Sequence, residues 1–190
     1  RNRLDHLGAD AHEFGVDIGV TGASGGGTQT FIPGALDPRP TVAFPAVMVG
    51  TRMQGGCVCE NAPFLRVATG NVEIAGLFAP RPMALSGAND WTVAIETHGL
   101  PQLRTLYGML GAPSNISGKC WPEFGHNYNQ VARESMYNWF NKHLKLGAKE
   151  PVQEQPFQLA TKEELSVWDG ENKRPASALG EAELRQSLAK

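Results

Sequence analysis

The stretch DIGVTGASGGGTQTF (residues 17–31) begins like a β-strand and ends like a helix, with a serine at the joint. The β-branched residues of VDIGVTG (16–22) predict a buried strand, and we expect a helix from Gly25 to about Leu36. Ser24 stands between them in a G-x-S-x-G pattern, in which flanking glycines leave room for a sharp, strained bend. We predict that the bend presents the Ser24 hydroxyl above the sheet as a nucleophile.

Strands and helices alternate along the rest of the chain. Apolar and helical patterns predict strands at 41–50, 81–90 and 114–121, and helices at 72–80, 92–112 and 130–147. This alternation is typical of α/β proteins with a parallel sheet and right-handed crossovers. We predict an α/β core over residues 1–147 and a polar C-terminal arm over 148–190, in which TKEELSVW (161–168) is a helical candidate.

The composition is that of an ordinary globular chain. Of the 190 residues 41% are hydrophobic and 19% are charged, and the formal net charge is −2. Because the chain has no block of basic residues, neither nucleic acid nor an anionic membrane is expected as partner. The chain also lacks a run of about 18 apolar residues, so no transmembrane helix is predicted. The three cysteines are expected to be buried free thiols, although a bridge from Cys57 or Cys59 to Cys120 is left open.

Two further polar residues follow predicted strands in the way that Ser24 does. Asp90 closes the strand predicted at 81–90, and His126 lies in the loop after the strand predicted at 114–121. Because the carboxyl ends of parallel strands share one sheet edge, these side chains are expected to gather there. A serine needs a base to take its proton, and a carboxylate to orient that base. The order Ser, Asp, His therefore predicts a hydrolytic triad, with Glu123 as a rival acid.

Other readings of the same residues are left open. The glycine-rich bend could be only a structural turn, or it could bind a phosphate at the helix N-terminus, although it lacks the lysine of a P-loop. Arg52, Trp91 and Glu123 are candidates for contact with substrate, against the simpler roles of solvated loop or core residue. The remaining histidines are expected to be structural or solvated.

Four stretches carry a resemblance to a known family: GVTGASGGGTQT (19–30), QGGCVCENAPFLR (54–66), FAPRPMALSGANDWT (78–92) and FGHNYN (124–129). Together they resemble the acetylxylan-esterase-like branch of the α/β-hydrolases, which are bacterial and often exported carbohydrate esterases. A more distant resemblance, through VTGAS, is to glucuronoyl esterases. The resemblance implies Ser24 as nucleophile, Asp90 as acid, His126 as base and the Gly25 N–H as half of the oxyanion hole. It also implies a secreted or periplasmic location and no metal or organic cofactor.

The chain departs from this family before the serine. Only about 16 residues precede the first predicted strand, whereas a complete α/β-hydrolase has several strands there. We therefore expect a C-terminal part of a longer sheet, with an exposed edge that a missing N-terminal segment or a partner chain, such as a second copy, would cover. The loop that supplies the second oxyanion donor would also be missing.

The sequence thus predicts a serine carboxylic ester hydrolase for small acyl esters, such as the acetyl esters of xylan. Three alternatives stay open: a glucuronoyl esterase, a serine peptidase of the same fold, and an inactive half-domain that binds a partner.

Overall fold

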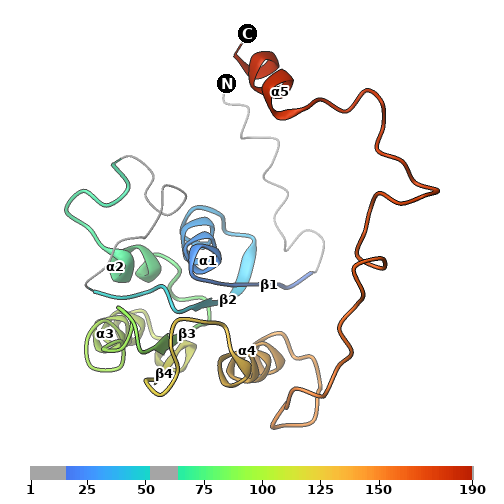
Figure 1. Cartoon of the computed structure of the whole chain (residues 1–190). Coiled ribbons are helices and arrows are strands. Elements are labelled where there is room, and N and C mark those ends of the chain that lie inside the picture. The colour runs from blue at the N-terminus through green and yellow to red at the C-terminus, as the bar shows by residue number, and fades with distance from the viewer. Residues whose placement is uncertain (1–15, 52–63, 190) are drawn as a thin grey trace. The chain divides into compact units, whose positions relative to one another are not determined.

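The computed structural model describes residues 16–51 and 64–189 of the chain (Figure 1). These residues fall into two units, one that ends at Glu154 and a second that begins at Gln155. The division predicted after residue 147 stays a prediction. Residues 148–154 belong to the first unit and follow its last helix.

Among the residues that the structure describes, the first unit is built on a sheet of four parallel strands in sequence order. The strands are β1 (Ile18–Ala23), β2 (Pro40–Ala46), β3 (Met83–Ala88) and β4 (Ile116–Trp121). Between and after them lie α1 (Gly25–Leu36), α2 (Asn71–Gly76), α3 (Leu100–Met109), η4 (Pro113–Asn115) and α4 (Gln130–His143). The prediction of an α/β fold with a parallel sheet is confirmed.

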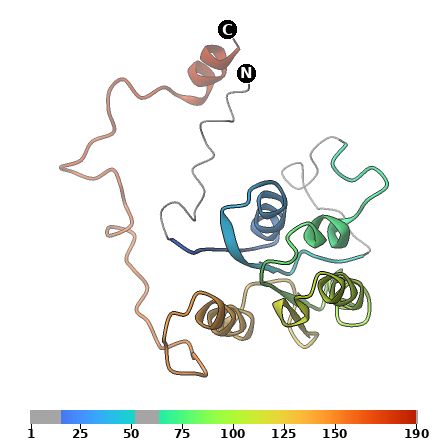
Figure 2. The same ribbon diagram turned by 180° about the vertical axis from the view of Figure 1, so that it is seen from behind.

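Each face of the sheet has its own hydrophobic core. On one face α1, α2 and α3 cover the strands, and the core includes Phe31, Ile74, Leu103 and Tyr107. On the other face α4 packs through Met136, Trp139 and Phe140 against buried residues of β2 and β3. Figure 1 and, from behind, Figure 2 show α4 apart from the group formed by the other three helices.

Pro45 interrupts the ladder between β2 and β3 rather than ending the strand. The Ala43 N–H donates to the carbonyl oxygen of Pro82 (2.9 Å), and the Val47 N–H donates to that of Ser86 (3.0 Å). Pro45 lies between these donors and has no N–H to give. The strand nevertheless continues to Ala46, which places the Ala46 carbonyl beside the start of α1.

Residues 148–154 are held along α4 by hydrogen bonds with side chains from three of its turns. Asn138 exchanges two hydrogen bonds with the backbone of this segment (2.8 and 3.0 Å), and Asn141 exchanges two more (2.9 and 3.0 Å). The Arg133 guanidinium forms a bidentate ion pair with the Glu154 carboxylate, in which Nε and Nη2 each lie 2.6 Å from a carboxylate oxygen. This pairing lowers the pKa of Glu154 below its ordinary value.

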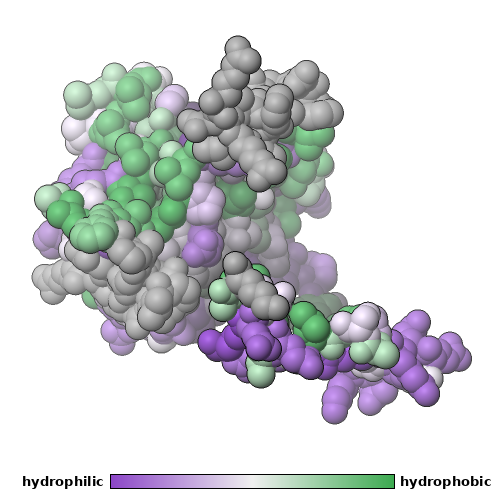
Figure 3. Space-filling model, turned by 90° about the horizontal axis from the view of Figure 1, so that it is seen from above, coloured by the Kyte–Doolittle hydropathy of each residue, from purple (hydrophilic) through white to green (hydrophobic). Residues whose placement is uncertain are grey.

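An apolar groove of about 310 Å³ runs between α1 and α2. Its lining includes Ile32, Ile74 and the exposed side chains of Leu36 and Leu77. The view from above looks onto these two helices, and hydrophobic side chains gather there, on the left of Figure 3.

Over residues 155–189 the second unit has one helix, and the sequence did not predict its place. At TKEELSVW, Thr161 and Glu164 exchange capping hydrogen bonds (2.7 and 3.2 Å), but the segment makes only turns. The helix of this unit is instead α5 (Glu181–Leu188), whose Glu183 carboxylate accepts from the Gly180 N–H (2.7 Å). Helix prediction was therefore wrong for 161–168.

Candidate active site

Ser24 occupies the bend between β1 and α1 in a strained backbone conformation. Its φ is 56° and its ψ is −122°, a region that residues with a side chain rarely adopt. The Ser24 N–H donates to the Ala46 carbonyl at the end of β2 (3.1 Å), which anchors the bend to the neighbouring strand. Strain of this kind stores about 1–3 kcal/mol and collects at functional sites.

Space for the bend comes from two glycines, but only one of them is a glycine of the G-x-S-x-G pattern. A Cβ on Gly22 would collide with the backbone of Gly26. A Cβ on Gly27 would lie 2.8 Å from both the Ala46 oxygen and the Met48 Cβ. A Cβ on Gly26 would meet nothing within 4 Å, so the expectation that crowding requires the second glycine of the pattern is wrong.

The two adjacent glycines give a matched stability test. We expect Gly27→Ala to destabilise the fold by about 1–3 kcal/mol, because the added methyl group overpacks the contact with β2. We expect Gly26→Ala to stabilise it by about 0.5–1 kcal/mol, because alanine loses less backbone entropy in a helix. Urea unfolding of the two variants measures the difference, and equal effects of the two substitutions would contradict the packing described here.

The N-terminus of α1 lies directly after Ser24. The first hydrogen bond of the helix runs from the Thr28 N–H to the Ser24 carbonyl (3.0 Å). The N–H groups of Gly25, Gly26 and Gly27 therefore precede the first carbonyl acceptor that the helix provides. Together with the helix dipole, they form a place where a negative charge beside Ser24 is stabilised.

Asp90 and His126 are joined by a hydrogen bond at the carboxyl edge of the sheet. The Asp90 Oδ2 atom lies 2.7 Å from His126 Nδ1. The Asp90 side chain is 6% exposed and the His126 side chain is 33% exposed, so the pair is shielded on the carboxylate side and open on the imidazole side. The carboxylate can only accept, so Nδ1 carries the proton and Nε2 is left as the basic nitrogen.

Thr92 orients the carboxylate of Asp90 and was missed in the sequence. Its N–H and its hydroxyl both donate to Asp90 Oδ1, at 2.6 and 2.5 Å. Its hydroxyl oxygen also accepts from the Ala88 N–H at the end of β3 (3.0 Å), and the residue is fully buried. The only signal in the sequence is an aspartate followed two residues later by threonine, a pattern typical of a local turn.

The loop that carries His126 is tied to the strand that leads to Ser24. The Tyr128 hydroxyl lies 2.6 Å from Thr21 Oγ1, and the Tyr128 ring stacks near Phe44 (6.4 Å between centroids). Arg133 of α4 donates to the Tyr128 carbonyl (2.5 Å). Burial raises the pKa of Tyr128 to about 12, so this hydroxyl stays protonated near neutral pH.

The residues predicted to touch substrate have different positions. Trp91 lies against His126, with 4.6 Å between ring centroids and 37° between ring planes. Glu123 is exposed in the His126 loop, and Asp90 is the carboxylate that hydrogen-bonds His126. Arg52 lies outside the described residues. A role in substrate contact stays a prediction for all three.

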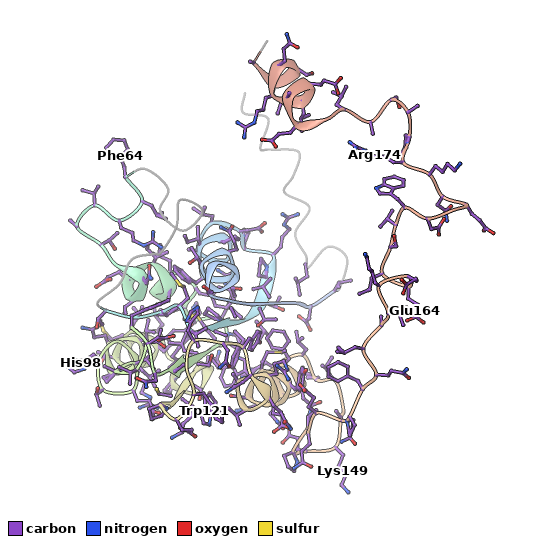
Figure 4. All side chains as sticks on the ribbon, in the orientation of Figure 1. Phe64, His98, Trp121, Lys149, Glu164 and Arg174 are labelled. Atoms are coloured by element: carbon purple, nitrogen blue, oxygen red, sulfur yellow. The ribbon has the colours of Figure 1, made fainter. Side chains whose placement is uncertain are left out.

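The other candidate groups lie elsewhere or serve the fold. His98 is exposed beside Thr97, on the outside of the compact unit near α3 (Figure 4). His143 packs on Trp139, and burial lowers its pKa. Cys120 is a buried free thiol whose pKa is raised mainly by burial, while Cys57 and Cys59 lie outside the described residues.

Neither a metal-binding cluster nor a membrane-spanning helix is present in residues 16–51 and 64–189. Among these residues no three His, Cys, Asp or Glu side chains are placed to hold a metal ion. No helix in the same ranges is long and apolar enough to cross a membrane.

Solved structures share this arrangement of strands and helices. Methylesterase BT1017 is 34% identical with a TM-score of 0.64, over 67% of this chain and 30% of its own. A carbohydrate esterase family 15 glucuronoyl esterase from Caldicellulosiruptor kristjansonii is 18% identical with a TM-score of 0.53, over 76% of this chain and 47% of its own. The chain has the α/β-hydrolase fold. Its similarity to carbohydrate esterases, first indicated by sequence motifs, is confirmed at the level of structure.

A glucuronoyl esterase from Sporotrichum thermophile has a similar structure, with 19% identity and a TM-score of 0.52 over 77% of this chain and 49% of its own. This α/β-hydrolase chain thus spans about a third to a half of the lengths of these esterases. No protein-family model and no curated protein sequence matches it.

Proposed function

We propose that this chain carries the catalytic residues of a serine carboxylic ester hydrolase that acts on carbohydrate esters. The observation that supports it most is the hydrogen bond between Asp90 and His126 (2.7 Å), at the sheet edge where Ser24 stands in a strained bend. A structural turn alone needs no oriented imidazole, and a phosphate-binding turn needs none either.

The proposed reaction proceeds through an acyl-enzyme. His126 Nε2 takes the proton of the Ser24 hydroxyl as Oγ attacks the ester carbonyl carbon, and the carbonyl oxygen becomes an oxyanion near the Gly25 N–H. As the tetrahedral intermediate collapses, the bond to the alcohol oxygen breaks and His126 gives its proton to that oxygen. Water then attacks the acyl group with His126 again as base, which releases the acid and restores Ser24.

Asp90 has a supporting part in each of these steps. Its carboxylate holds the Nδ1 proton and stabilises the imidazolium that forms when His126 takes a proton. Thr92 fixes the carboxylate from the other side.

Two ester classes are candidates for the substrate. The motif resemblance favours a small acyl group, such as acetyl on xylan. The similarity to a methylesterase and to glucuronoyl esterases favours instead an ester of a sugar acid, in which the sugar is the acyl part. The rates of hydrolysis of acetylated xylan and of methyl glucuronate distinguish the two classes. Of the two, we propose the acetyl ester as the substrate. A secreted or periplasmic location is part of the same proposal.

A fluorophosphonate probe tests the nucleophile directly. We expect one adduct per chain in intact-mass measurement, because the probe phosphonylates a serine that an adjacent base activates. The same adduct is expected to be absent from Ser24→Ala. Labelling of wild type and variant alike would place the reactive serine elsewhere, and no labelling of either would contradict a triad assembled in this chain.

A further inference from the structure

A polar cavity of about 440 Å³ lies beside the candidate triad and has no part in the reaction proposed above. Its lining combines two hydroxyls, an amide, a guanidinium and a carboxylate, from Thr51, Thr69, Gln102, Arg66 and Glu73. The volume falls within the roughly 300–1,000 Å³ that is usual for ligand sites.

The cavity opens at the same edge of the sheet as the triad. Gly50 and Thr51 follow the carboxyl end of β2, while Gly70 and Gln102 lie at the start of α2 and in the first turn of α3. In a parallel sheet these strand ends and helix starts share one edge, where ligands bind.

Trp91 connects the cavity to the triad. A Cβ added at Gly50, in the cavity wall, would lie 2.9 Å from the Trp91 carbonyl oxygen, so the two backbones are in close contact. The Trp91 ring lies 4.6 Å from the His126 ring, between centroids. One tryptophan therefore separates the wall of the cavity from the catalytic base.

The polar groups of the cavity are held in place. Arg66 is only 9% exposed, and its Nε donates to Asn71 Oδ1 (2.7 Å). Asn71 is fully buried, and its amide donates to the Met48 carbonyl just after β2 (3.2 Å). Glu73 accepts from the Gly70 N–H (2.9 Å). A preorganised set of donors and acceptors recognises a ligand at a lower entropic cost than mobile side chains do.

We propose that this cavity binds a second sugar unit of the substrate. Hydroxyl, amide, guanidinium and carboxylate groups suit a ring that carries both donors and acceptors, whereas one cation beside one carboxylate does not suit a polyanion. This inference rests on the proposed function and specifies its substrate: the enzyme acts on esters within oligosaccharides in preference to esters of single sugars.

The test compares two exposed positions on α3. We expect Gln102→Ala to lower kcat/KM for acetylated xylotriose by about fivefold through one lost hydrogen bond, and to leave kcat/KM for p-nitrophenyl acetate unchanged. Arg104→Ala, on the same helix but outside the cavity lining, is expected to change neither. Equal values of kcat/KM for the acetylated trisaccharide in wild type and Gln102→Ala would overturn the proposal.

A binding measurement keeps the test independent of turnover. Xylotriose is titrated into Ser24→Ala and followed by amide chemical shifts, with trigalacturonate as the polyanion control. Shifts at Thr69 are expected with xylotriose but not with trigalacturonate, and in the double variant with Gln102→Ala they are expected to need about fivefold more xylotriose. No shift at Thr69 with xylotriose, or an equal shift with trigalacturonate, would overturn the subsite, whatever the outcome of the esterase assay. A failed esterase assay with the xylotriose shifts present would count only against the proposed reaction.

Discussion

Ser24→Ala is expected to lower the turnover of p-nitrophenyl acetate by about 10⁶-fold, the loss typical when a triad nucleophile is removed. The reason is that no other hydroxyl stands in the bend at the start of α1, beside the Gly25 N–H that we propose as an oxyanion donor. Steady-state hydrolysis by the purified chain measures the effect. Ser114→Ala, an exposed serine in η4, is the matched control and is expected to keep full turnover. Turnover by Ser24→Ala close to that of wild type would exclude the proposed mechanism.

The same residue links stability to activity. Alanine at position 24 keeps the unfavourable φ of 56°, whereas glycine adopts it without a penalty. We therefore expect Ser24→Gly to be more stable than Ser24→Ala by about 1 kcal/mol in urea unfolding, with both variants inactive. Equal stability of the two would mean that the bend relaxes and stores no strain.

The parts of the site that depend on local sequence and strand order could be predicted. Ser24 follows from the strand-to-helix pattern, and Asp90 and His126 follow from the rule that parallel strand ends share an edge. The structure places Asp90 and His126 in direct contact, and it ties the loop after His126 to β1.

The parts that depend on packing could not be predicted. That Gly27 rather than Gly26 is crowded depends on how closely the end of β2 approaches α1, which no local pattern encodes. The role of Thr92 depends on how the turn after β3 folds back, so that its hydroxyl reaches both the Ala88 N–H and the Asp90 carboxylate. In the second unit, TKEELSVW and α5 both have capping contacts, so propensity did not distinguish the turn from the helix.

Asp90→Asn is expected to lower turnover by about 10⁴-fold while the fold stays intact. Both donors of Thr92 point at one oxygen of residue 90, so the asparagine must place its amide oxygen there. Its amide NH₂ then faces His126 Nδ1, which has to accept, and the imidazole proton moves to Nε2. With Nε2 protonated, His126 cannot take the proton of Ser24.

This tautomer change gives the prediction a signature that lost stability would not produce. Nitrogen NMR of His126 is expected to report a proton on Nδ1 in the wild type and on Nε2 in Asp90→Asn. Glu123→Gln is the matched control, because Glu123 is exposed in the same loop while Asp90 is the carboxylate that holds the imidazole, and it is expected to change turnover by less than about twofold. A large loss in Glu123→Gln with near-normal turnover in Asp90→Asn would show that the exposed carboxylate is the working acid, and that the Asp90–His126 hydrogen bond only holds the loop against β3.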